Sequence, residues 1–238
     1  MTARAARQRI HRALREYANP ERKAHTAGYF PTSMEIVGVA VPDIRRAIRP
    51  EVKALRHQPA SAVTELAEAL LDGGLHEGRQ AAYELLGARP DVLKCLGVRD
   101  VERLGRGNDN WASVDAFAVS VAGPCWRLGG VTDAAVTRWT RSKDRWWRRT
   151  ALAATVSLNL PSRGGTGDVP RTMAVCEALA EDDDPMVAKA LSWALRSVIR
   201  HDPETVEAYV ERHGETLPRF VAREVRNKLE TGKKNPRS

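Results

Sequence analysis

The stretch RRTALAA at residues 148–154 begins with two basic residues and continues with small, mostly apolar residues. Two other stretches follow a similar order, RQAAYELL at residues 79–86 and AKALSWAL at residues 188–195. Small residues let neighbouring helices pack closely, and this order is typical of the second helix of a HEAT-like helical pair. The recurrence therefore predicts a stack of helical pairs.

Helical periodicity extends on both sides of these stretches, and no convincing alternating strand pattern occurs. Pro, Gly and Asp mark the expected turns. The fold class predicted is all-α, a HEAT-like helical-repeat solenoid, with residues 1–231 as one domain and residues 232–238 as a basic flexible tail. Asn19-Pro20 should end the first helix. The expected helices are 2–18, 42–57, 60–72, 76–88, 90–104, 110–122, 131–141, 145–158, 169–181, 185–200, 203–212 and 217–231.

The composition indicates a protein of the reducing cytoplasm with a polyanionic partner. The 238 residues include 38 Lys and Arg against 30 Asp and Glu, a formal net charge of +8. Cys95, Cys125 and Cys176 are odd in number and far apart, which excludes a disulfide framework and a CxxC metal site. No apolar run approaches the roughly 18 residues of a membrane span, and the first residues lack the apolar core of a secretion signal.

Three segments combine aromatic, acidic and cationic residues at a repeat-like spacing. From Trp111 to Arg149 is 38 positions (149 − 111), and from Arg149 to Trp193 is 44 (193 − 149). Both lie near the roughly 40 to 47 residues of HEAT-like repeats, which present corresponding residues side by side on one concave surface. Asp115 follows Trp111 by four positions and should share its helix face. The pattern suggests chemistry on nucleic acid.

Basic residues gather around several tryptophans, which predicts that the concave face is basic and binds DNA. Six Lys or Arg and one acidic residue, Asp144, lie between Arg138 and Arg149. Such a cluster can contact phosphates, although a solvated charged face would have the same composition. Indoles beside cations can stack on nucleotides. Trp139 and one of Trp146 or Trp147 are instead expected in the core.

These residues carry a resemblance to a known family. The chain resembles the AlkD-type alkylpurine DNA glycosylases through Trp111 and Asp115 in WASVD, Arg149 in WWRRTALA, and Trp193 in KALSWALR. Weaker likeness, including the Tyr29 segment, extends over nearly the whole chain. The resemblance implies a HEAT-like enzyme of base excision repair that removes alkylated purines from double-stranded DNA without extruding the base, with Trp111, Asp115 and Trp193 around the lesion-bearing nucleotide and Arg149 on the nearby DNA.

The chemistry of the implied substrate fits these residue types. A purine alkylated at N3 or N7 is cationic, so its glycosidic bond is weakened and its departure leaves an oxocarbenium-like sugar. Asp115 can stabilise that cation or act as a general base, and the faces of Trp111 and Trp193 favour cationic groups. No cofactor or metal is required, and a monomer suffices. The expected DNA contacts are Arg149, Arg148, Lys189, Arg196, Tyr29 and Arg145.

Two other functions remain open. A noncatalytic HEAT-repeat scaffold could bind distorted or branched DNA, or protein, through the same face, although Asp115 argues against it. A metal-dependent nuclease would need several clustered carboxylates, and the sequence places only Asp115 in the expected site. Asp109 and Asp144 lie near helix starts, where capping explains them. The six histidines show no ligand spacing and are interpreted as surface or packing residues.

Overall fold

The computed structural model describes residues 2–236, and it shows an all-α helical-repeat fold. Within these residues the only strand-like pairing is an isolated bridge between Glu35 and Leu75. None of their helices combines the length and the apolar character needed to cross a membrane. The helices are α1 Ala3–Glu16, α2 Pro20–Tyr29, α3 Val41–Ala54, α4 Ala60–Leu71, α5 His76–Gly87, α6 Pro90–Cys95, α7 Val98–Gly105, α8 Trp111–Phe117, α9 Gly123–Arg127, α10 Asp133–Thr140, α11 Arg145–Asn159, α12 Val169–Ala178, α13 Pro185–Val198, α14 Pro203–Arg212 and α15 Arg219–Thr231.

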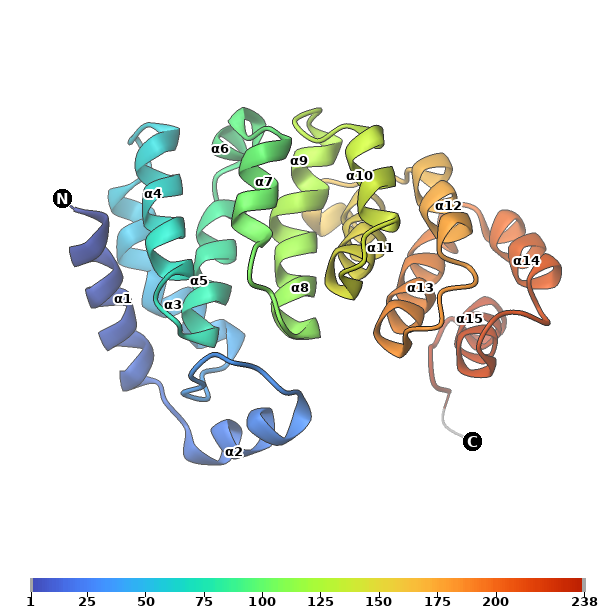
Figure 1. Ribbon diagram of the computed structural model, residues 1–238, viewed down its shortest axis with the longest axis horizontal. Coiled ribbons are helices and arrows are strands. Elements are labelled where there is room, and N and C mark those ends of the chain that lie inside the picture. Colours follow the sequence, from blue (N-terminus) through green and yellow to red (C-terminus); the bar gives the residue numbers. More distant parts are fainter. Residues whose placement is uncertain (1, 237–238) are drawn as a thin grey trace.

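The helices form two layers in a curved row (Figure 1). Each repeat is a pair of helices, whose first member lies in one layer (the first layer) and packs on its second member in the other layer (the second layer). The pairs are α4 with α5, α10 with α11, α12 with α13, and α14 with α15. The second helices α5, α8, α11, α13 and α15 also contact one another in succession. In Figure 1, α2 and α15 lie towards the same side of this row, one near each end.

Helix α11 is the centre of the core. Every residue from Arg149 to Asn159 is buried, because α8, α9, α10, α12 and α13 all pack around this helix. A helix enclosed on all sides needs small residues where neighbours approach, and the stretch at 148–154 supplies them. At Gly123, for example, an added Cβ would lie 2.4 Å from the carbonyl oxygen of Ala154.

The helices differ most from the predicted ones in three places. Asn19-Pro20 starts α2 instead of only ending α1: the Asn19 side chain accepts a hydrogen bond from Arg22 N at 2.8 Å, and Pro20 occupies the first turn. The expected helix 90–104 is broken at Leu96 and Gly97 into α6 and α7. The expected helix 110–122 continues through a π-helical segment, Ala118–Ala122, into α9.

The segment after α2 is held by a buried carboxylate. Glu77, 2% exposed, accepts hydrogen bonds from the backbone N–H groups of Val37, Gly38 and Val39, the shortest being 2.7 Å to Gly38 N. Gly38 has a φ of +83°, and a Cβ there would lie 2.3 Å from Asn19 O. The turn that returns the chain from α2 to α3 is therefore fixed to α5, which fixes the place of α2.

Candidate active site

A cavity of about 710 Å³ lies along the second-layer helices, and we call it the inner cavity. Its wall comes from α2, α8, α11, α13, α15 and the segments next to them. Six of its lining side chains are aromatic, five are cationic and two are carboxylates. The lining residues are Tyr29, Phe30, Pro31, Asn110, Trp111, Asp115, Arg145, Trp146, Arg149, Met186, Lys189, Trp193, Arg196, Phe220, Glu224 and Lys234.

Helix α8 presents Trp111 and Asp115 to the inner cavity from one face. Asn110 caps this helix: its side chain accepts a hydrogen bond from Ser113 N at 3.0 Å. The two residues are four apart, so they lie one turn from each other, as their spacing predicted. The π-helical segment Ala118–Ala122 follows α8 directly, and single π turns of this kind are frequent near functional sites.

The four residues from Trp146 to Arg149 of α11 have different surroundings, because each step along a helix turns by about 100° and only residues three or four apart share a face. Trp146 and Arg149 line the inner cavity. Trp147 packs against Phe117 and Trp139 with ring centroids 6.1 and 5.2 Å apart. Trp139 is 3% exposed, which confirms the prediction that it belongs to the core. Of Trp146 and Trp147, one of which was expected in the core, Trp147 is partly buried and packs against the core.

Arg149 forms a bidentate ion pair with Asp115. Its Nε lies 2.8 Å from Oδ1 and its Nη2 lies 2.7 Å from Oδ2. The third nitrogen, Nη1, donates to the carbonyl oxygen of Met186. Both side chains are largely buried, 6% exposed for Arg149 and 18% for Asp115. A planar guanidinium in this geometry fixes the plane of the carboxylate and both of its oxygens.

Burial raises the pKa of Asp115 above its ordinary value, because the charged form loses hydration. The charge and hydrogen bonds of Arg149 act in the opposite direction. The pair therefore holds a carboxylate with little solvent contact beside aromatic rings. Such a group interacts strongly with any charge that develops next to it, because few water molecules screen it.

Helix α13 supplies a stripe of four residues to the inner cavity. Met186, Lys189, Trp193 and Arg196 recur at intervals of three and four, which places them on one face of the helix. Asp184 caps the helix by accepting a hydrogen bond from Met186 N at 2.7 Å. Lys189 is exposed, and no ion pair to it occurs among residues 2–236.

Aromatic residues from the end of α2 close one side of the inner cavity. The rings of Tyr29 and Phe30 meet Trp111 edge to face, at centroid distances of 5.4 and 5.7 Å. Tyr29 is 64% exposed, so much of its surface is free for a partner. The structure thus brings Tyr29 together with Trp111, although 82 positions (111 − 29) separate them in the sequence.

Asp109 anchors the segment that carries these rings, which corrects its predicted role as a helix cap. The cap of α8 is Asn110. Asp109 instead accepts hydrogen bonds from Thr32 Oγ1, Ser33 N and Ser33 Oγ at 2.8, 2.7 and 2.8 Å. Burial acts to raise the pKa of Asp109, but these hydrogen bonds outweigh it and the pKa lies below its ordinary value. Asp144 is the cap of α11, as predicted.

Three predicted DNA contacts, Arg148, Arg145 and Arg149, have other partners in the structure. Arg148 lies outside the inner cavity: its Nε is 2.6 Å from Asp182 Oδ2, and its Nη1 donates to Ser142 O at 2.9 Å. Arg145 lines the cavity, with its guanidinium 4.8 Å from the ring centroid of Trp146 and 3.4 Å from Asp184. The buried Arg149 orients Asp115, a function that the sequence did not suggest.

The C-terminal helix α15 and the residues after it contribute three lining residues that the sequence did not indicate. Phe220 and Glu224 lie one turn apart on α15, and Lys234 follows the end of that helix. The expectation that Asp115 is the only carboxylate of the site was wrong, because Glu224 also lines the cavity. Only the four-residue spacing of Phe220 and Glu224 could have indicated this. Among residues 2–236 no group of three His, Cys, Asp or Glu side chains is arranged to hold a metal ion.

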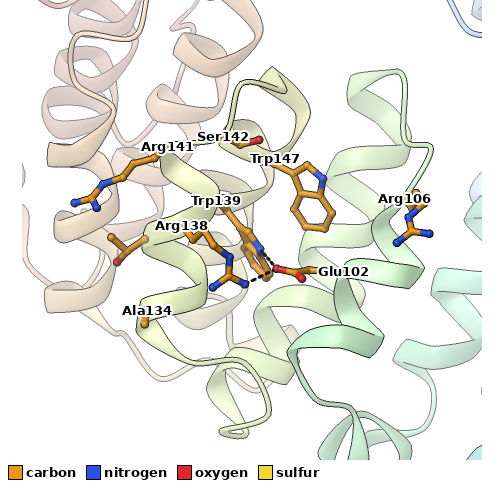
Figure 2. A pocket seen from close by; sticks show the side chains of 9 residues that line it. Glu102, Arg106, Ala134, Arg138, Trp139, Arg141, Ser142 and Trp147 are labelled. Carbon is orange, nitrogen blue, oxygen red and sulfur yellow. Dashed lines mark hydrogen bonds and ion pairs between the residues drawn. The ribbon is translucent and has the colours of Figure 1, made fainter.

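A second cavity, of about 890 Å³, lies between the first-layer helices α7 and α10 and the start of α11 (Figure 2). We call it the outer cavity. Its carboxylate is Glu102, which accepts hydrogen bonds from Arg138 Nη2 at 2.7 Å and Trp139 Nε1 at 2.9 Å. Figure 2 shows both side chains converging on Glu102, with Trp147 beside them. None of the predicted site residues lines this cavity.

Comparison with known proteins identifies the family of this chain. Residues 10–229 match the family model of the DNA alkylation repair enzymes. A solved structure described as a predicted DNA alkylation repair enzyme from Enterococcus faecalis superposes with a TM-score of 0.63 at 17% identity, over 90% of this chain and 97% of that one. This likeness shows the shared fold. A comparison with curated proteins gives no match. The chain belongs to the family of DNA alkylation repair enzymes, and it therefore has a DNA-binding role in DNA repair.

Proposed function

We propose that this protein is a monofunctional DNA glycosylase of base excision repair. Its substrates would be cationic purines alkylated at N3 or N7 in double-stranded DNA, such as 3-methyladenine and 7-methylguanine. The observation that carries the proposal is the buried Asp115, oriented by Arg149 in a cavity with aromatic walls and an excess of cations. A single chain supplies every lining residue, so a monomer is sufficient.

The reaction needs little acid catalysis, because the leaving base is already cationic. The bond between the purine nitrogen and C1′ breaks, and its electron pair leaves with the base, which becomes neutral. C1′ is left with oxocarbenium character, and water adds there and loses a proton, giving an abasic site. The barrier therefore depends on how well the protein stabilises a positive charge at the sugar.

Asp115 is suited to that electrostatic task. Both of its oxygens already accept hydrogen bonds from Arg149, so the carboxylate needs no reorganisation when the sugar becomes cationic. Each oxygen keeps a second lone pair, which can orient the attacking water or accept its proton. The electron-rich faces of Trp111 and Trp193 add a further attraction for the cationic sugar or lesion.

The lining favours approach from the backbone of the duplex. Arg145 on α11 and the pair Lys189 and Arg196 on α13 line the inner cavity, an arrangement that suits a run of phosphates. Most enzymes that process bases extrude the nucleotide into a closed pocket. We propose instead that this protein acts without base flipping, with the resemblance to the AlkD-type enzymes and the spread of the lining over five helices as support.

The test is release of free base from duplex DNA that contains 7-methylguanine or 3-methyladenine. We expect release by the intact protein and a decrease of about 100-fold or more for Asp115→Asn, because that variant removes the charge and nearly keeps the shape. Glu102→Gln is the matched control: it removes a carboxylate charge in the outer cavity and should leave release unchanged. Binding of DNA without base release by the intact protein would contradict the proposal and favour a noncatalytic DNA-binding scaffold.

A further inference from the structure

A buried carboxylate of the inner cavity, Glu224, plays no part in the proposed reaction. It is 9% exposed and lies on α15, next to α13. Its Oε2 accepts a hydrogen bond from Ser192 Oγ at 2.6 Å, and its Oε1 lies 3.1 Å from Lys234 Nζ. Burial acts to raise the pKa of Glu224, but Ser192, Lys234 and Arg196 outweigh it and lower the pKa. Glu224 is therefore ionised when it holds Lys234.

Lys234 reaches Glu224 because the chain turns back after α15. Gly232 adopts a left-handed conformation with a φ of +71°, which ends the helix and reverses the chain. The Asn227 side chain then donates to Lys234 O at 3.1 Å, and Lys233 N donates to Thr231 Oγ1 at 3.2 Å. Residues 232–234, which the sequence placed in a flexible tail, thus have defined partners on α15. Lys234 enters the cavity lining, and its neighbour Lys233 does not.

The charges around Glu224 leave this corner of the cavity cationic. Arg196 Nε donates to Ser192 Oγ at 3.2 Å, so Ser192 links Arg196 to Glu224. One carboxylate is therefore flanked by two cations, beside Trp193. The Lys234 side chain is 46% exposed, and an ammonium group has three N–H donors. Only one is needed for Glu224, so the others can bind an incoming anion.

We propose that Lys234 binds a phosphate of the DNA at the inner cavity, and that Glu224 is the positioning residue that holds Lys234 there. The inference rests on the proposed function only in that duplex DNA occupies this face. It does not require that a glycosidic bond is broken. It also makes the residues that follow α15 part of the DNA site.

The salt dependence of DNA binding tests this inference. Each phosphate contact contributes about 0.9 to the slope of the logarithm of the association constant against the logarithm of the salt concentration. The probe is undamaged duplex DNA. We expect Lys234→Ala to lower the magnitude of the slope by about 0.9 and to weaken binding about tenfold at low salt. Lys233→Ala is the matched control, since it removes the same charge one position earlier, outside the cavity, and should leave the slope unchanged. Lys234→Arg should keep the intact slope.

An unchanged slope for Lys234→Ala, or an equal decrease for Lys233→Ala, would overturn the inference. Thermal unfolding of each variant identifies any loss of fold. Glu224→Gln tests the positioning role: we expect the slope to fall and binding to weaken, although the variant adds net positive charge. Tighter binding would show that Glu224 only repels the DNA. If the intact protein releases no base while Lys234→Ala still lowers the slope, the proposed function fails and this inference stands.

Discussion

The inner and outer cavities contain the same kinds of side chain but place them in different environments. Each has tryptophans, arginines and a carboxylate paired with arginine. The two cavities are similar in size, at about 890 Å³ for the outer and 710 Å³ for the inner one. At Glu102, 34% exposed, hydrogen bonds from Trp139 and Arg138 outweigh burial and lower the pKa. At Asp115, 18% exposed, burial outweighs Arg149 and raises the pKa.

The environment of a carboxylate, and not the size of a cavity, therefore distinguishes a candidate site. In the outer cavity, indole Nε1 of Trp139 is used by Glu102 and its ring is 3% exposed, so it has little surface for a ligand. In the inner cavity the carboxylate is shielded from water, while other cations line the same cavity, among them Lys189, which forms no ion pair with any residue from 2 to 236. Shielding strengthens an interaction with a developing charge, and the remaining cations attract a polyanion.

The largest difference between the two cavities is expected in the free energy of unfolding when the arginine of each ion pair is removed. Arg149→Ala leaves a largely buried Asp115 without its cation, and we expect it to lower the free energy of unfolding by about 3 kcal/mol. Arg138→Ala removes an exposed partner of Glu102 and should cost less than about 1 kcal/mol. Urea denaturation measures both. Equal losses would show that the two ion pairs are equivalent and would remove the basis of the comparison.

The next largest effect is expected in the pH dependence of base release, which should follow the protonation of Asp115 and not that of Glu102. Because burial raises the pKa of Asp115, protonation should remove its charge at a higher pH than for an ordinary Asp, about 3.9. Release should therefore fall as the pH drops through that raised pKa, up to about tenfold per pH unit. The same raised pKa means that the folded state binds this proton more tightly than the unfolded state, so protonating Asp115 does not unfold the protein.

Carboxyl groups whose pKa is lowered in the fold behave in the opposite way. Glu102 and Glu35 stabilise the folded state while ionised, and this stability is lost only as the pH falls towards their lowered pKa values. We therefore expect base release to be lost at a higher pH than helicity, with single-turnover release and circular dichroism measured on the same samples. Loss of both at one pH would indicate that unfolding alone limits activity.

A smaller effect should follow from loosening one wall of the inner cavity. Asp109→Ala removes the acceptor for Thr32 and Ser33, so the segment that carries Tyr29 and Phe30 loses its anchor. We expect a loss of about 1 to 2 kcal/mol in unfolding free energy, together with weaker binding of lesion DNA. The control Asp43→Ala removes an ion pair to Arg46 on the surface of α3 and should change neither value measurably. Unaltered DNA binding by Asp109→Ala would exclude Tyr29 and Phe30 from the interface.

Local signals explain which parts of the fold could be predicted. The long periodic segments of α11 and α13 begin and end within two residues of their predicted limits. Helix α2 was missed because Asn19-Pro20 is both a stop signal for one helix and a start signal for the next. The break between α6 and α7 falls at Gly97, which the spacing of apolar residues did not reveal.

The helical repeat and the register of its central residues could be predicted from local sequence patterns. The successive second-layer helices α8, α11 and α13 carry Trp111, Asp115, Arg149 and Trp193. This order could be predicted because the spacing of residues and the runs of small side chains are local properties of the chain. Which side chains pair in the inner cavity depends on how these helices pack in the tertiary structure. Arg149 pairs with Asp115 across 34 positions, and Lys234 meets Glu224 because the chain turns back at Gly232. Burial and pairing depend on which helices pack together, and neither property is encoded in a local pattern.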